Sequence, residues 1–379
     1  ANTTGFDNVA VGGATLQANT TGVQNTGLGY GALAANTTAN NNTAVGHNSL
    51  YLNTTGTQNT SVGSFSLDAN TTGDYNTAMG YAALGAATTA TSNTAIGKGA
   101  LTTNTAGSRN TALGFEAAEL STASDNVAIG YKALDTTTSG SNNTAVGTEA
   151  MDANTTGSAN VAVGYRTLDA NTTGSNNLAL GQYAMGANTT ASYNTAVGYK
   201  SLYANTTGHS NVAVGTNALD ANTTGAGNVA IGYRSLDNNT TATGNTGVGW
   251  YSMNSNTTGY ANTAVGFSAL QVQTTGHENT AVGYQTLDAL TTGQYNTAVG
   301  KSAGGAVTTG TNNTLIGGLS GDALTTGYEN VAIGTSALGA DTKGAVSVAI
   351  GINSLSAQNF TSATAAYNVA VGANAGLSV

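Results

Sequence analysis

The chain has 379 residues, of which only 7% are charged and 39% are hydrophobic, and it contains 53 glycines but no proline or cysteine. Its net charge of −9, with only 8 Lys and Arg residues, excludes the basic surface of a nucleic-acid-binding protein. No apolar run is long enough for a membrane-spanning helix, and the low net charge per residue is not typical of a disordered chain.

One five-residue motif organises the whole sequence. It reads Asn-Thr-Ala-Val-Gly at 42–46 and recurs, with small substitutions, 22 times from Asn8–Gly12 to Asn368–Gly372. The spacing is 17 residues at every step but two: it is 16 between Gly114 and Gly130, and 21 between Gly351 and Gly372. A fixed period of this kind indicates stacked repeats with no single central core.

Each repeat has the composition of strands and turns. The motif alternates at period two and is rich in β-branched residues, which favours a strand. The Asn-Thr-Thr-Gly stretch that follows has turn composition, and 17 residues are too few for a strand-helix-strand unit. We therefore predict an all-β fold, a parallel β-solenoid or β-roll of about 22 coils, each with two short strands and two turns.

The array is expected to be continuous. We predict one domain over residues 1–379, with a longer insertion or local cap at 352–367 near the C-terminal end. The sequence opens in phase with the repeat, which fits a mature chain or a piece of a longer one. At a rise of about 4.8 Å per coil, 22 coils would form a rod of roughly 105 Å.

The first column of the motif is Asn in every copy except one, where Ser347 stands. Two interpretations remain open: a buried ladder in which each amide bonds to the next coil, or an Asn that shapes the turn before the strand. Both make this a structural column, represented by Asn42, Asn76, Asn143, Asn160, Asn177, Asn194 and Asn262.

The remaining motif columns predict a thin core. The third column is mostly Ala, the fourth is always aliphatic or Met, and a Leu or Met usually stands four residues after the Gly. The Ala and Gly columns suggest close approach, including approach by another chain. The fifth column is always Gly, which indicates positive φ or a close backbone contact; it includes Gly46, Gly80, Gly147, Gly164, Gly198 and Gly266.

The column directly after the Gly accepts both aromatic residues and Lys, which indicates exposure. One interpretation is a repeated contact surface for a glycan or another fibre, and the other is rings that only cover neighbouring coils. The candidate contact residues are Tyr81, Tyr131, Tyr165, Tyr199, Tyr233, Trp250 and Tyr284.

The turn also matches the N-glycosylation sequon. The match comes with any turn rich in Asn and Thr, so it leaves glycosylation open. The acids before the turn, such as Asp152 and Asp169, lack the spacing of a calcium loop and are interpreted as solvated. The sequons fall at Asn2, Asn19, Asn36, Asn53, Asn70, Asn154, Asn171, Asn188, Asn205, Asn222, Asn239 and Asn256.

Catalysis finds no support in the sequence. The three histidines, His47, His209 and His277, lie in different repeats, and no nucleophile elbow, phosphate loop or metal-ligand cluster occurs. We therefore predict a protein that is not an enzyme, with no catalytic, cofactor or metal site.

The fragment Ser347-Val348-Ala349-Ile350-Gly351 resembles the core of the YadA-like head repeats of trimeric autotransporter adhesins, and Asn126–Gly130 and Asn330–Gly334 are close variants. The Asn-Thr-Ala-Val-Gly form is similar to repeats of bacteriophage tail fibres. The resemblance covers essentially the whole chain and implies a left-handed β-roll, trimerisation and adhesion. The 17-residue unit is longer than that family's usual one, and no stalk or anchor sequence follows.

Three functions are compatible with these observations. The first is an extracellular structural or adhesive fibre on a cell surface, which assembles with copies of itself into a homotrimer or end-to-end filament and contacts host-surface glycan or protein. The second is the receptor-binding shaft of a bacteriophage tail fibre, located on the virion. The third is an ice-binding solenoid, which the interrupted Thr column disfavours. The lack of cysteine fits an extracellular protein without disulfides as well as a cytosolic one.

Overall fold

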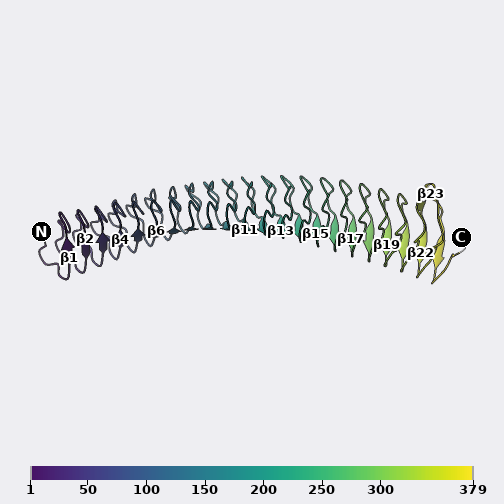
Figure 1. Cartoon of the computed structure of the whole chain (residues 1–379), viewed down its shortest axis with the longest axis horizontal. Coiled ribbons are helices and arrows are strands. Elements are labelled where there is room, and N and C mark those ends of the chain that lie inside the picture. The colour runs from purple at the N-terminus through teal and green to yellow at the C-terminus, as the bar shows by residue number, and fades with distance from the viewer. Residues whose placement is uncertain (1, 378–379) are drawn as a thin grey trace. The chain divides into compact units, whose positions relative to one another are not determined.

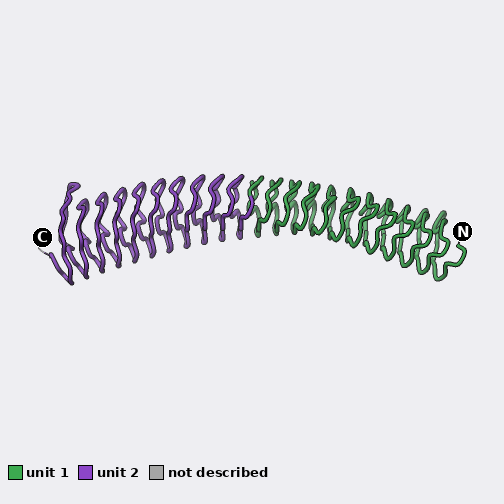
Figure 2. The backbone as a smooth tube through the Cα atoms, turned by 180° about the vertical axis from the view of Figure 1, so that it is seen from behind, with its two compact units in different colours: residues 1–191 green, residues 192–379 purple. Residues whose placement is uncertain are grey.

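The computed structural model describes residues 2–377. It confirms the predicted fold class: the chain is a parallel β-solenoid of about 21 turns with a spacing of about 17 residues. The residues fall into two compact units, one ending at Ala191 and one beginning at Ser192 (Figure 2). Within each unit, the strands of successive coils lie side by side (Figure 1).

Each unit has its own series of strands. Those of unit 1 are β1 (Val9–Val11), β2 (Thr26–Leu28), β3 (Thr43–Val45), β4 (Thr60–Val62), β5 (Thr77–Met79), β6 (Thr94–Ile96), β7 (Thr111–Leu113), β8 (Val127–Ile129), β9 (Thr144–Val146), β10 (Val161–Val163) and β11 (Leu178–Leu180). Those of unit 2 are β12 (Thr195–Val197), β13 (Val212–Val214), β14 (Val229–Ile231), β15 (Thr246–Val248), β16 (Thr263–Val265), β17 (Thr280–Val282), β18 (Thr297–Val299), β19 (Thr314–Ile316), β20 (Val331–Ile333), β21 (Gly344–Ala345), β22 (Val348–Ile350), β23 (Thr364–Ala365) and β24 (Val369–Val371).

Strands pair in parallel with the equivalent strand of the next coil, in register with the repeat. In unit 1, for example, Val161 of β10 lies opposite Leu178 of β11, and in unit 2 Thr263 of β16 lies opposite Thr280 of β17. Each side chain therefore stacks on its counterpart, which turns the sequence columns into physical rows along each unit.

The prediction of a second strand in each coil is wrong. The segment after the Gly forms turns, because the residues two and four positions beyond it adopt left-handed backbone conformations, such as Asn48 (φ 52) and Leu50 (φ 51). Such a conformation costs roughly 1–2 kcal/mol per residue. Two contacts offset it: the Leu50 side chain is fully buried, and its N–H donates to Ser66 O of the next coil at 3.0 Å.

The core is thinner than the sequence suggests. The Ala of the motif and the Leu after the Gly are fully buried, as at Ala44 and Leu50, while the aliphatic fourth column points outward. The expectation that this fourth column fills the core is therefore wrong. The same packing explains paired exceptions: Leu315 replaces an Ala, and its side chain fills the space left where Gly304 and Gly321 replace Leu.

The fifth motif column contains only Gly because the next coil of the same chain lies too close to leave room for a side chain. Gly46 has φ +136, and a Cβ added there would lie 2.6 Å from Gly63 O of the next coil. The Ala column faces the interior and the Gly column faces the adjacent coil. The expectation that these two columns admit another chain is therefore wrong, because the close approach is within the chain.

The long interval at 352–367 forms an extra local pairing: β23 pairs in parallel with β21. It also carries a side chain that repairs the one gap in the Asn column. Gln358 donates through Nε2 to Ser347 Oγ at 3.3 Å and to Asp341 Oδ2 at 2.6 Å, and it accepts from Asn368 Nδ2 at 2.7 Å. The insertion thus supplies the amide that Ser347 lacks.

Candidate interaction surfaces

The first Asn column lies inside the coil and forms a continuous hydrogen-bonded ladder in each unit. Asn160 is representative: its backbone N–H and its Nδ2 both donate to Asn143 Oδ1, at 3.0 and 3.3 Å, and its Nδ2 also donates to Gly174 O at 2.9 Å. The structure buries the seven representatives named from the sequence, Asn42, Asn76, Asn143, Asn160, Asn177, Asn194 and Asn262. No ligand can reach these amides without opening the coil.

A second Asn ladder was missed by sequence reasoning, which interpreted these residues only as part of a turn that matches the glycosylation sequon. Asn53 of the Asn-Thr-Thr-Gly turn is fully buried, and its Nδ2 donates to Asn36 Oδ1 at 3.0 Å and to Gly56 O at 2.9 Å. Gly56 O also accepts from Asn42 Nδ2 at 2.9 Å, so the two ladders share carbonyl acceptors. The fixed position of this Asn in successive repeats was the sequence signal that could have indicated a second ladder.

This burial bears directly on the glycosylation sequons. Of the twelve Asn-Thr-Thr sequons named above, the Asn residues from Asn19 to Asn256 are at most 2% exposed, and Asn2 alone of the twelve lies on the surface. A glycan on any buried member would have to displace hydrogen bonds of the ladder, so the sequon pattern is a consequence of the core.

The outer face of the sheet is uncharged and combines an aliphatic row, the fourth motif column, with a row that is mostly Thr, the second column. Alternation along each three-residue strand points the second and fourth motif columns outward, and these columns contain only Thr, Val, Leu, Ile and Met. Several of the large aliphatic residues are well exposed, including Leu28 at 46%, Leu113 at 44% and Ile231 at 39%. We call this the sheet face; it is present in both units.

The aromatic column also lies on the surface. The seven residues named from the sequence are 37% to 55% exposed: Tyr81, Tyr131, Tyr165, Tyr199, Tyr233, Trp250 and Tyr284. Many rings contact a neighbouring coil's ring: Phe115 stacks on Tyr131 at 5.6 Å, and Phe267 on Tyr284 at 5.4 Å, each within 14° of parallel. Stacked rings cover one another's faces, so the geometry favours the interpretation that they cover neighbouring coils.

The acids before the turn are not simply solvated. Burial raises the pKa of Asp152 and Asp169 above the usual value for Asp, and the carboxylate of Asp135 in the preceding coil raises that of Asp152 further. Lys132 and Arg166 lie nearby and act in the opposite direction on Asp152. Two carboxylates stacked one coil apart, such as Asp135 and Asp152, repel each other, and protonation of one carboxylate removes this repulsion.

Two other features, a metal-ligand cluster and a membrane-spanning helix, are absent from residues 2–377. No cluster of three or more His, Cys, Asp or Glu residues there could hold a metal ion. In the same range, no helix is long and apolar enough to cross a membrane.

Comparison with known proteins places the chain in no established family. No family model matches the sequence, and a search of curated proteins found no significant match. The sheet face and the aromatic column are therefore the features of this chain that bear on its function.

Proposed function

We propose that this protein is the shaft of an extracellular or virion-borne structural fibre, in which copies associate side by side through the sheet face. The observation that carries the proposal is the uncharged sheet face, whose aliphatic fourth-column row continues from coil to coil in both units. Extended apolar surfaces of this kind are rare on monomeric soluble proteins and mark interaction sites.

A second copy is the partner that this face fits best. The sheet face presents rows of methyl groups and Thr hydroxyls at one fixed period. The identical face of a second copy has the same period and can therefore match it from coil to coil. None of the outward positions of the strands holds a charged residue, so direct contact between two sheet faces brings no charged side chains together. Symmetric association of identical patches is the commonest mode of protein assembly.

The motif itself adds support. The five-residue motif that resembles adhesin head repeats and tail-fibre repeats includes the two outward strand residues that form this face. An adhesive fibre and a tail-fibre shaft place the same physical demands on the chain, because both need a long element of repeated coils that presents surface to a receptor.

The proposal is tested by placing charge on the sheet face. Val146→Asp with Val163→Asp puts two carboxylates in neighbouring outward positions of β9 and β10, where a partner would have to bury them. We expect the assembled species to dissociate into single chains in analytical ultracentrifugation. The matched control is Phe115→Asp with Tyr131→Asp, which adds the same charge in two neighbouring coils on the aromatic column and should leave assembly intact.

Two results would overturn the proposal. In the first, the Val146 and Val163 variant assembles as wild type does at the same concentration. In the second, the aromatic-column variant dissociates instead, which would place the interface on that column. Circular dichroism of both variants establishes that the solenoid remains folded.

A further inference from the structure

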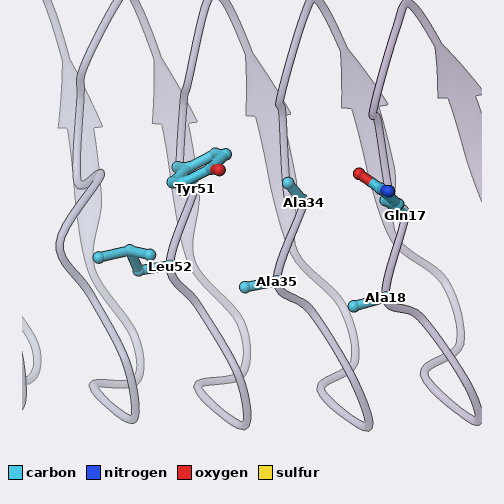
Figure 3. A pocket seen from close by; sticks show the side chains of 6 residues that line it. All are labelled: Gln17, Ala18, Ala34, Ala35, Tyr51 and Leu52. Carbon is cyan, nitrogen blue, oxygen red and sulfur yellow. The ribbon is translucent and has the colours of Figure 1, made fainter.

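One junction between two coils of unit 1 lacks hydrogen bonds that other junctions of the unit have. Equivalent residues of successive coils lie side by side, as Figure 3 shows for Gln17, Ala34 and Tyr51, so junctions can be compared bond by bond. The exceptional junction lies between the turns at 104–107 and 121–123, and the second of these turns belongs to the one coil of unit 1 that has 16 residues instead of 17. We call this junction the short-coil seam.

Three contacts that normally join two turns are absent from the short-coil seam. In an ordinary junction, Thr155 N and Thr155 Oγ1 both donate to Thr172 O, each at 2.9 Å. Thr105 and Thr122 occupy the same positions at the seam, and neither bond forms between them in the described part of the chain. The second Asn ladder is also broken, because Ser121 stands in place of Asn and its buried Oγ has no hydrogen-bond partner among the described residues.

The sequence of the short coil accounts for these losses. Its turn reads Ser121-Thr122-Ala123 where most turns read Asn-Thr-Thr-Gly, and a turn with one residue fewer cannot match the preceding turn atom for atom. The buried Ala118 stands where most coils place Leu or Met, so this coil also buries less apolar surface. Fewer hydrogen bonds and less apolar burial both lower the free energy of local opening.

An ion pair crosses the short-coil seam at the place where these bonds are missing. Arg109 Nε and Nη2 donate to Asp125 Oδ1 and Oδ2 at 2.6 and 2.8 Å, a bidentate arrangement. This hydrogen bonding lowers the pKa of the Asp125 carboxyl, so the pair is ionised at neutral pH. Beside it, Ser108 N donates to Ser124 Oγ and Asp125 N donates to Ser108 O, each at 3.0 Å. The strands of the same two coils, β6 and β7, are paired in the ordinary register.

We propose that the turns of the short-coil seam separate locally while β6 and β7 stay paired, and that the Arg109–Asp125 ion pair holds these turns together. Bidentate geometry is the arrangement in which an exposed Arg–carboxylate pair contributes most. The seam is then a point in unit 1 at which ionic strength controls local opening, because salt screens an exposed pair. The proposal concerns a turn and not the sheet face, so it does not depend on whether copies assemble.

The test is residue-resolved hydrogen-exchange mass spectrometry on the full chain. The amides of Ser108 and Asp125 report on the short-coil seam. Their matched references are Ser158 N, which donates to Ser175 Oγ, and Asn176 N, which donates to Ser158 O, again at 3.0 Å each. These two bonds cross the junction whose turn hydrogen bonds are complete. We expect Ser108 and Asp125 to be protected about ten-fold less than Ser158 and Asn176.

Two variants and a change of salt test the role of the ion pair. Arg109→Gln removes the pair and should lower the protection of Ser108 and Asp125 by a further factor of roughly two to five. Sodium chloride at about 1 M should act on the wild-type seam in the same direction. The charge swap Arg109→Asp with Asp125→Arg places the opposite charges across the same seam and should restore the protection.

The matched control is Arg166→Gln, which removes the ion pair with Glu149 from the coils of the reference junction. The turn hydrogen bonds remain there, so the protection of Ser158 and Asn176 should not change. Four results would overturn the proposal: equal protection at the two junctions, no effect of Arg109→Gln, no recovery in the charge swap, or an equal loss in the Arg166→Gln control. Loss of protection in β6 and β7 together with the turn would also overturn it, since the whole coil would then open.

Discussion

Replacing one buried amide within unit 1 tests the interior of the solenoid. In the variant Asn160→Leu, the backbone N–H of Asn177 loses its acceptor, Asn160 Oδ1, which lies 2.9 Å away in the native protein. A buried donor without a partner costs about 1–3 kcal/mol. Gly174 O keeps a donor, Asn171 Nδ2 at 3.0 Å, so it adds little to the cost.

The other losses are smaller. Asn177 Nδ2 loses its contact with Asn160 Oδ1 at 3.1 Å but retains Ala191 O at 2.8 Å. Together with the branched Leu side chain in a narrow interior, these changes bring the expected destabilisation to about 2–4 kcal/mol. The measurement is urea unfolding followed by circular dichroism, with the midpoint compared with wild type.

Tyr165→Ser is the control, because Tyr165 lies five residues after Asn160 in the same coil but on the surface, in edge contact with Tyr183 at 5.5 Å. Its loss should cost less than about 1.5 kcal/mol. If Asn160→Leu unfolds at the wild-type midpoint while Tyr165→Ser is strongly destabilised, the assignment of inside and outside is reversed and the ladder argument fails.

Two further outcomes are expected. Because burial raises the pKa of Asp152 and Asp169 in the folded state, folding takes up protons as the pH falls from 7 toward 4, so stability should rise over that window and be lost again as the pH is raised. The double variant Asp152→Asn with Asp169→Asn should show a weaker rise in pH-dependent unfolding experiments, and a wild-type stability that falls steadily from pH 7 to 4 would contradict the argument. Gln358→Ala removes the amide that joins Ser347 to Asp341, so hydrogen exchange at residues 341–368 should accelerate while strands β12–β18 keep their protection; unchanged exchange there would show that the insertion does not depend on this side chain.

The 17-residue period and the period-two alternation of the motif were enough to predict the solenoid and its parallel strands. A 17-residue spacing with a strand-forming motif leaves few other folds, and a stacked column must contain side chains that tolerate contact with copies of themselves. Asn and Gly satisfy this requirement in different ways, by bonding along the axis and by leaving room for the adjacent carbonyl.

Composition could not reveal the left-handed backbone at Leu50 and its equivalents. Leu is a poor candidate for positive φ, and the conformation is offset by the burial of its side chain and the hydrogen bond from its N–H to the next coil. The same limit applies to the fourth motif column: Val45 and its equivalents read as core residues because they are aliphatic, whereas the pleat turns them outward. The buried Asn of the turn was hidden by its resemblance to a glycosylation site.

The central functional claim is that the sheet face joins copies of this chain, and a mass measurement of the intact wild-type protein tests it most directly. One chain has a mass of 37.1 kDa. The account predicts that light scattering or mass photometry will find a multiple of this value, persisting on dilution into the nanomolar range. A single species of 37.1 kDa at every concentration examined would contradict the account, because the aliphatic row of the sheet face would then be exposed to water in the native protein.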